Sequence, residues 1–115
     1  MEQKSLANKQ DSINSKEPEK VLRFSREEID KIDNELIDLI QKRTSLSKKI
    51  VLAKFALNMD IFDPKREKLI YEKIEKISIE KKLNQNTKNS LIEVMNILIN
   101  LSKKEQNEII NDENE

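Results

Sequence analysis

The amino-acid sequence predicts an all-α protein in which each chain forms three helices, one long, one short and one of medium length. Apolar residues recur at steps of three and four through most of the chain, which is the spacing of amphipathic helices. Helix start signals precede two of these patterns, a capping box at Ser25 and Glu28 and an Asp63–Pro64 pair. The first pattern is also too long for a small monomer. We therefore expect an intertwined helical-bundle homodimer.

The first helix is expected over about residues 25–57. Its apolar residues are Ile29, Ile32, Leu36, Leu39, Leu46, Ile50, Ala53 and Leu57. Asn58 follows, and asparagine tolerates the left-handed conformation that ends many helices, which matters in a chain without glycine. About 32 helical residues at ~1.5 Å each span roughly 48 Å, far beyond the ~12 Å radius of gyration of a compact domain of this size. A second copy of the chain is the simplest cover for the apolar face.

Two shorter helices complete the predicted domain. The second covers about residues 64–81, with Asp63 as its N-cap. The polar turn NQNTKN separates it from a third helix over about residues 87–110. The expected organisation is a disordered polar extension at 1–21, a helical domain at 22–110 and a frayed acidic tail at 111–115.

Composition excludes many kinds of site. The 115 residues contain 22 Lys+Arg and 22 Asp+Glu, so no net charge favours nucleic acid or a membrane as a partner. Cysteine, histidine and glycine are absent, which removes thiol nucleophiles, common metal ligands and glycine-rich phosphate loops. We expect no cofactor and no metal, and a cytoplasmic location because no signal-like or membrane-length apolar run is present. The chemistry that remains uses charge, hydrogen bonding and positioning.

Two cations interrupt the apolar face of the first helix. Arg43 stands between Leu39 and Leu46, where the pattern calls for an apolar residue. Lys54 follows three helical turns later, so both side chains point to one side, about 16 Å apart. Together they could close on a small anion. Either residue could instead fix helix register or reach solvent with its aliphatic stem.

Polar residues also stand on the apolar sides of the other helices. Ser102 and Gln106 continue the stripe of the third helix, and Arg66 and Glu67 lie in the first turn of the second. The first pair could mark the point where the helix leaves the core, and Glu67 could complement the helix dipole. The chain nevertheless has arginine at only four positions, against 18 lysines. The planar fork of arginine suits carboxylates and phosphates, so the combination indicates a pocket for a small polyanion.

These residues, at these spacings, resemble the all-helical class of chorismate mutases over about residues 22–108. The most specific stretch is DPKREKLIYEKI, supported by IDKIDNELIDLIQKR and ILINLSKKEQ. The family has two arginines and a lysine on its first helix, an Asp-x-x-Arg-Glu sequence at the start of its second, and often a Ser-x-x-x-Gln pair on its third. The matching residues here are Arg26, Arg43, Lys54, Asp63, Arg66, Glu67, Ser102 and Gln106.

The resemblance implies an intertwined homodimer that rearranges chorismate, a dianion, to prephenate on the route to phenylalanine and tyrosine. By analogy Arg43 would bind one carboxylate, and Arg26, donated by the other subunit, would bind the second. Ser102 would assist and Arg66 would support this binding.

The remaining implied roles concern the reacting bond and the ring. Lys54 and Gln106 would hydrogen-bond the ether oxygen as the carbon–oxygen bond breaks. Glu67 and the backbone around Asp63 would hold the ring hydroxyl. The implied catalytic residues are thus Lys54, Gln106, Glu67 and Arg43.

One departure concerns the connection between the second and third helices, which is a few residues longer than in the family. An ungapped alignment would place Ile99 and Lys103 at the site instead of Ser102 and Gln106. The gapped alignment is preferred, because it keeps both the polar pair and the apolar stripe.

Two other functions stay open from the sequence. Isochorismate pyruvate lyases share the fold and much of the anion-binding set, but lack the Arg-Glu pair that this chain has at Arg66 and Glu67. A non-catalytic helical dimerisation or partner-binding module is the alternative from another class, and in it Arg43 would only fix register.

Overall fold

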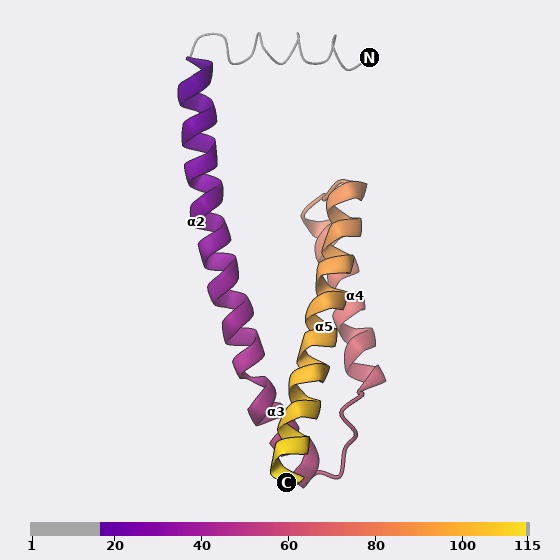
Figure 1. The fold of residues 1–115 in the computed structure, drawn as a ribbon. Helices are drawn as coiled ribbons and strands as arrows, with labels where there is room; N and C mark the ends of the chain where they lie inside the picture. Colours follow the sequence, from indigo (N-terminus) through magenta and orange to yellow (C-terminus); the bar gives the residue numbers. More distant parts are fainter. Residues whose placement is uncertain (1–16, 115) are drawn as a thin grey trace. The chain divides into compact units, whose positions relative to one another are not determined.

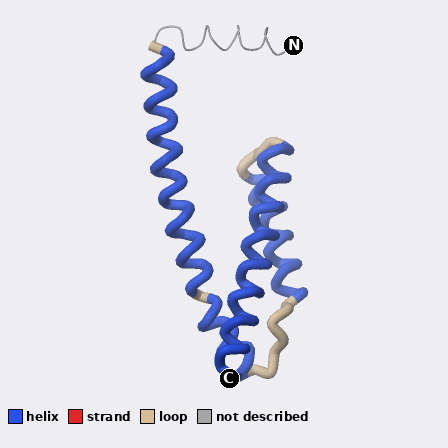
Figure 2. The backbone as a smooth tube through the Cα atoms, in the orientation of Figure 1, coloured by secondary structure: helices blue, strands red, loops and turns tan. Residues whose placement is uncertain are grey.

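The computed structural model describes residues 17–114, and all of their regular structure is helical (Figure 1). The helices are α2 (Pro18–Ser45), α3 (Ser47–Ala56), α4 (Pro64–Glu80) and α5 (Gln85–Asn114). No residue within 17–114 belongs to a strand (Figure 2). The all-α prediction is confirmed for this range: the long helix corresponds to α2 and α3 together, the short one to α4 and the medium one to α5. None of these helices is long and apolar enough to cross a lipid bilayer.

The first helix begins at Pro18, and the capping box predicted at Ser25 is wrong. Proline suits the first position of a helix, because its φ is preset and no backbone donor is needed there. The carbonyl of Glu17 accepts two backbone hydrogen bonds from the first turn, at 3.1 and 3.2 Å. Residues 18–21, predicted to be disordered, are therefore helical. The rest of that predicted extension, residues 1–16, lies outside the described residues.

A single residue, Leu46, interrupts the long predicted helix. Its backbone N–H bonds to the carbonyl of Arg43 at 3.3 Å, three residues back rather than four. The Ser45 hydroxyl donates to the carbonyl of Lys42 at 2.7 Å. Because serine hydroxyls that bond back to the preceding turn bend helices, this local competition accounts for the end of α2. The chain resumes as α3 at Ser47, which is buried.

Asn58 reverses the chain after α3, as predicted. Its φ of 56° is left-handed, a conformation that asparagine tolerates better than most residues with a Cβ. The N–H of Asn58 bonds to the carbonyl of Phe55 at 3.2 Å, and that of Met59 to the carbonyl of Lys54 at 2.8 Å. These are the two bonds of a Schellman motif. The reversal sends the following segment back past the last turn of α3.

Both ends of α4 are also fixed locally. Asp63 is its N-cap, as predicted, because its Oδ1 accepts the backbone N–H of Arg66 at 3.1 Å, and Pro64 occupies the first helical position. At the other end Lys82 adopts a left-handed φ of 52° and turns the chain toward α5. The cap at Asp63 therefore fixes the position of the first turn of α4, which carries Arg66 and Glu67.

Asn84 sets the start of α5. Its Oδ1 accepts the backbone N–H of Thr87 at 2.8 Å, so the helix begins at Gln85, slightly earlier than predicted. The helix then continues to Asn114, so residues 111–114, assigned from the sequence to a frayed tail, are helical.

The described chain divides into two units between Leu39 and Ile40. In the second unit α5 packs against α3 and α4 (Figure 1). Val51, Ile74 and Ile99, one from each of these helices, form its buried apolar core. This small core holds the three helices in place around the site described below.

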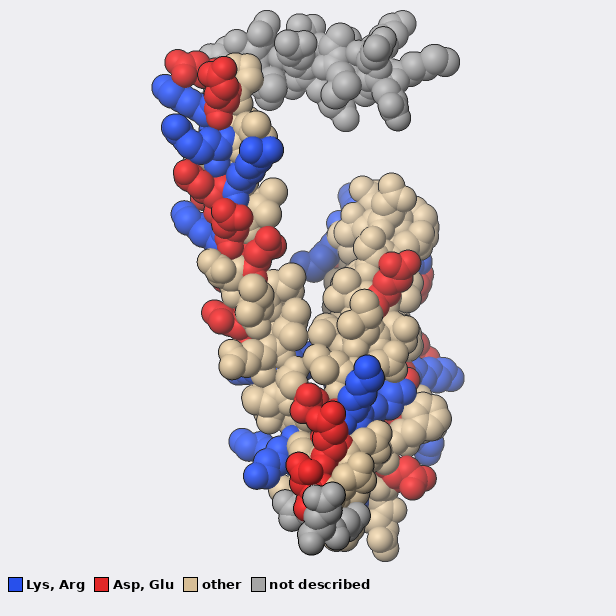
Figure 3. Space-filling view, in the orientation of Figure 1, with Lys and Arg blue, Asp and Glu red and all other residues tan. Residues whose placement is uncertain are grey.

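Among the described residues, the first unit consists of the N-terminal part of α2, and most of its apolar side chains are exposed. Phe24 is 63% exposed, Ile32 59% and Leu39 62%, and α2 has no buried residue. Charged side chains gather along one edge of the helix in the space-filling view (Figure 3). Within this unit, therefore, nothing covers the apolar side of an amphipathic helix.

Candidate active site

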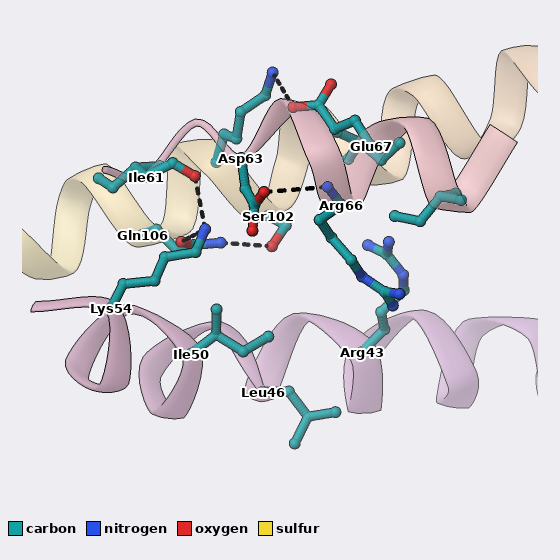
Figure 4. A pocket seen from close by; sticks show the side chains of 13 residues that line it. Arg43, Leu46, Ile50, Lys54, Ile61, Asp63, Arg66, Glu67, Ser102 and Gln106 are labelled. Atoms are coloured by element: carbon teal, nitrogen blue, oxygen red, sulfur yellow. Dashed lines mark hydrogen bonds and ion pairs between the residues drawn. The ribbon is translucent and has the colours of Figure 1, made fainter. Parts of the chain in front are cut away.

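One cavity, of about 400 Å³, gathers most of the predicted site residues (Figure 4). Its volume lies within the range of small-molecule sites. The end of α2, helices α3, α4 and α5, and the connection between α3 and α4 all contribute to its walls. The lining residues are Arg43, Leu46, Ile50, Lys54, Ile61, Asp63, Arg66, Glu67, Ile70, Ile99, Ser102, Lys103 and Gln106. Every predicted site residue except Arg26 is among them.

Lys54 is held by two acceptors inside this cavity. Its Nζ donates to the carbonyl of Ile61 at 2.6 Å and to Oε1 of Gln106 at 2.9 Å (Figure 4). The first bond exists because the reversal at Asn58 returns the chain to α3. An ammonium group has three N–H donors, so these two bonds fix the group while leaving one donor for a ligand.

Gln106 links Lys54 to the hydroxyls of α3 and α5. The residue is only 3% exposed, and its Nε2 donates to Oγ of Ser102 at 3.0 Å. Oγ of Ser102 in turn lies 3.4 Å from Oγ of the buried Ser47. Because Oε1 of Gln106 accepts and Nε2 donates, the orientation of the amide is determined by its neighbours. Its second N–H stays available for a ligand.

Arg43 enters the cavity from the last turn of α2, at the end opposite Lys54 (Figure 4). Its Nη1 donates to the backbone carbonyl of Leu98 on α5 at 3.0 Å, and the contact is half-buried. A guanidinium carries five N–H donors in a planar fork. One of them anchors the side chain to α5, and the others can bind an anion.

The first turn of α4 places two charges of opposite sign at the cavity. Arg66 and Glu67 both line it, and the Asp63 cap fixes the turn on which they stand. Oε2 of Glu67 lies 3.4 Å from Nζ of Lys103 on α5. The side chains of this ion pair are only 23% and 29% exposed.

The structure does not bring Arg26 into this group. Arg26 lies on the exposed part of α2 within the first unit and is absent from the cavity lining. The cavity therefore holds seven of the eight predicted site residues.

Two groups at the site were not predicted as functional. They are the Ile61 carbonyl that holds Lys54 and the buried hydroxyl of Ser47. Lys103, which lies beside Glu67, is placed at the site only by the ungapped alignment. Ile99 and Lys103, the outcome of the ungapped alignment, line the cavity together with Ser102 and Gln106.

Charge and shape together define what the cavity can bind. Four cations line it, against two carboxylates. Apolar side chains of Leu46, of helices α3, α4 and α5, and of the connection between α3 and α4 complete the walls. Such a site suits a small molecule with an apolar body and more than one negative charge.

Comparison with known proteins identifies the family. The model of the family described as chorismate mutase type II matches residues 25–107. A chorismate mutase from Methanocaldococcus jannaschii is 40% identical over 78 residues, which cover 68% of this chain and 76% of that protein. A bifunctional chorismate mutase/prephenate dehydratase from Aquifex aeolicus is 41% identical over 59 residues, 51% of this chain but 16% of that longer protein. No solved structure matches the chain significantly. The chain belongs to the chorismate mutase type II family.

Proposed function

We propose that the chain, as a chorismate mutase, isomerises chorismate to prephenate in the cavity between α3, α4 and α5. The observation that carries this proposal is the position of the Lys54 ammonium, fixed by Ile61 and Gln106 within a cavity in which cations outnumber carboxylates. Chorismate is a small dianion with an apolar ring, so its charge and shape match this lining.

The reaction needs little beyond positioning and electrostatics. A carbon–oxygen bond of the enolpyruvyl ether breaks while a carbon–carbon bond forms within one molecule, without a nucleophile or a proton transfer. A protein can accelerate such a step by holding the flexible substrate in its folded conformer. It can also place donors where negative charge develops on the ether oxygen in the transition state.

Lys54 and Gln106 are the donors proposed for the ether oxygen. Each retains an N–H after its hydrogen bonds within the protein, and the two side chains contact each other at 2.9 Å. Two donors that are already in place need no reorganisation during the reaction. Lys54 has the stronger effect, because it carries a full positive charge in a half-buried site.

The carboxylates of the substrate are assigned to the arginines. Arg43, held by the Leu98 carbonyl, presents the rest of its fork to one carboxylate. Ser102 assists through its hydroxyl, and Arg66 adds positive charge from α4. Arg26 of a second subunit binds the other carboxylate.

The ring hydroxyl is assigned to the start of α4. Glu67 accepts a hydrogen bond from it, and the backbone around Asp63 supplies a further polar contact. This assignment favours a mutase over an isochorismate pyruvate lyase. The lyases are expected to lack the Arg-Glu pair that this chain has at Arg66 and Glu67.

The active form is proposed to be an intertwined homodimer located in the cytoplasm, as suits an enzyme of amino-acid biosynthesis. The exposed apolar side chains of α2, among them Phe24 and Ile32, support the dimer, because a second copy is the simplest cover for such a face. The position of Arg26 on this same helix supports its donation across the interface.

Heterodimers offer a direct test of this shared site. We expect Arg26→Ala and Arg43→Leu to be inactive as homodimers. Chains of the two kinds, co-expressed with different tags and purified through both, should regain about half of the wild-type activity per dimer, because one of two sites then has both arginines. Steady-state turnover of chorismate measures the recovery. An inactive heterodimer would contradict donation between subunits, and an active Arg26→Ala homodimer would remove Arg26 from the site.

The function itself is tested by spectroscopic assays of the purified chain with chorismate and, in parallel, with isochorismate. We expect enzyme-dependent formation of prephenate from chorismate. Release of pyruvate from isochorismate alone would instead assign the chain as a lyase. If a folded dimer turned over neither substrate, the remaining interpretation would be a non-catalytic helical dimerisation or partner-binding module.

A further inference from the structure

We infer that Lys103 is a positioning residue that holds the Glu67 carboxylate for the substrate's ring hydroxyl, an inference that rests on the proposed function. Nζ of Lys103 lies 3.4 Å from Oε2 of Glu67, and both residues line the cavity. The pair joins α5 to the first turn of α4. It thereby ties the helix that carries Ser102 and Gln106 to the carboxylate that faces the ring.

A second contact restricts the ammonium of Lys103. Nζ lies 5.1 Å from the centroid of the Phe62 ring, within the range of a cation–π interaction. Phe62 belongs to the connection just before the Asp63 cap. A lysine side chain is flexible and its charge is strongly hydrated. The contact with Phe62 therefore helps the ion pair to keep the ammonium beside Glu67.

Glu67 has an electrostatic reason to need such a partner. Its carboxylate stands in a cavity proposed to receive a dianion, and like charges at short range repel. The ammonium of Lys103 offsets this repulsion, and a carboxylate acts only as a hydrogen-bond acceptor. With Oε2 bonded to Lys103, Oε1 is the oxygen that accepts the hydrogen bond from the ring hydroxyl.

Two simpler roles give different results on mutation. If the pair only joined α5 to α4, its loss would affect the stability of the fold and leave the kinetics of the folded protein unchanged. If Lys103 instead bound a substrate carboxylate directly, its loss would matter whether or not Glu67 was charged. The effect of Lys103 in a Glu67→Gln background therefore separates these roles.

The experiment compares kcat and KM for chorismate in the wild type, Lys103→Met, Lys103→Arg, Glu67→Gln and the Lys103→Met/Glu67→Gln double variant. Lys104→Met, at the exposed next position of α5, is the matched control. We expect Lys103→Met to lower kcat/KM about tenfold, the size of one charge-assisted hydrogen bond, chiefly through a higher KM. Lys103→Arg should retain most of the activity. In the Glu67→Gln background the further loss should be below about twofold.

Each outcome decides the inference. A full tenfold loss in both backgrounds would overturn it in favour of direct substrate binding. Wild-type kinetics in Lys103→Met, or an equal loss in Lys104→Met, would overturn it in favour of a structural or general charge effect. In these cases the mutase assignment stands, because the wild type still forms prephenate. A wild type without turnover would overturn the proposed function and this inference with it.

Discussion

Replacement of Lys54 by alanine should lower kcat for chorismate by about a hundredfold to a thousandfold, the usual effect of losing one donor to a developing oxyanion. The substitution removes the charged donor that Ile61 and Gln106 hold in the cavity. KM should change less, because the ether oxygen is weakly charged before the bond breaks. Steady-state kinetics of the purified variant measures both constants.

Lys49→Ala is the matched control for Lys54→Ala, because Lys49 is an exposed lysine on the same helix. It should keep wild-type kinetics. The loss of Lys54 also removes the donor that the Ile61 carbonyl and Oε1 of Gln106 share, and each buried acceptor left unsatisfied costs about 1–3 kcal/mol of stability. Circular dichroism should therefore accompany the assay, so that kcat refers to folded protein. A folded Lys54→Ala variant with wild-type kcat would contradict the proposed role.

Arg43→Leu should lower kcat/KM by about a hundredfold or more, since it removes the guanidinium proposed to bind a substrate carboxylate through a pair of charge-assisted hydrogen bonds. The dimer should remain intact or become more stable. The substitution puts an apolar residue where the helical pattern calls for one, and it removes a half-buried cation. Activity assays and thermal unfolding of the same preparation measure the two effects.

Arg43→Lys and Lys42→Leu complete this comparison. The lysine keeps the charge but lacks the planar fork, so it should recover only part of the activity. Lys42 is the exposed neighbour of Arg43, and its replacement should leave activity unchanged. A stabilised Arg43→Leu dimer with full activity would contradict the proposed role of Arg43 in substrate binding. It would indicate that Arg43 only fixes the register of the helices.

The parts of the fold that sequence predicts are those set by local chemistry. Asn58 and Asp63 end and start helices through hydrogen bonds to residues within a few positions, so their roles can be read directly. Ser25 shows that a capping sequence alone does not locate a helix start. The helix already begins at Pro18, so Ser25 lies within it and cannot cap it. The interruption at Leu46 could not be predicted either. It depends on the side-chain rotamer of Ser45, whose hydroxyl bonds to the carbonyl of Lys42.

The candidate site divides in a similar way. Arg43 and Gln106 were predicted because each is a polar residue in an apolar pattern, and both line the cavity. The Ile61 carbonyl could not be predicted, because every residue has a carbonyl and only the folded connection shows which one faces Lys54. Lys103 is one lysine among 18; the ungapped alignment places it at the site, but its contacts with Glu67 and Phe62 appear only in the folded chain.

The uncovered apolar side of α2 also has a thermodynamic consequence. Helix α2 buries none of its residues within the described chain, and most helical stability in proteins comes from packing an apolar face. In the homodimer proposed above, its folding is therefore coupled to association with the second copy. For such a protein dilution and heat act on the same equilibrium, so the melting temperature rises with protein concentration. Arg26 lies on this helix, and turnover per chain should accordingly decline when the protein is diluted below the dissociation constant of the dimer.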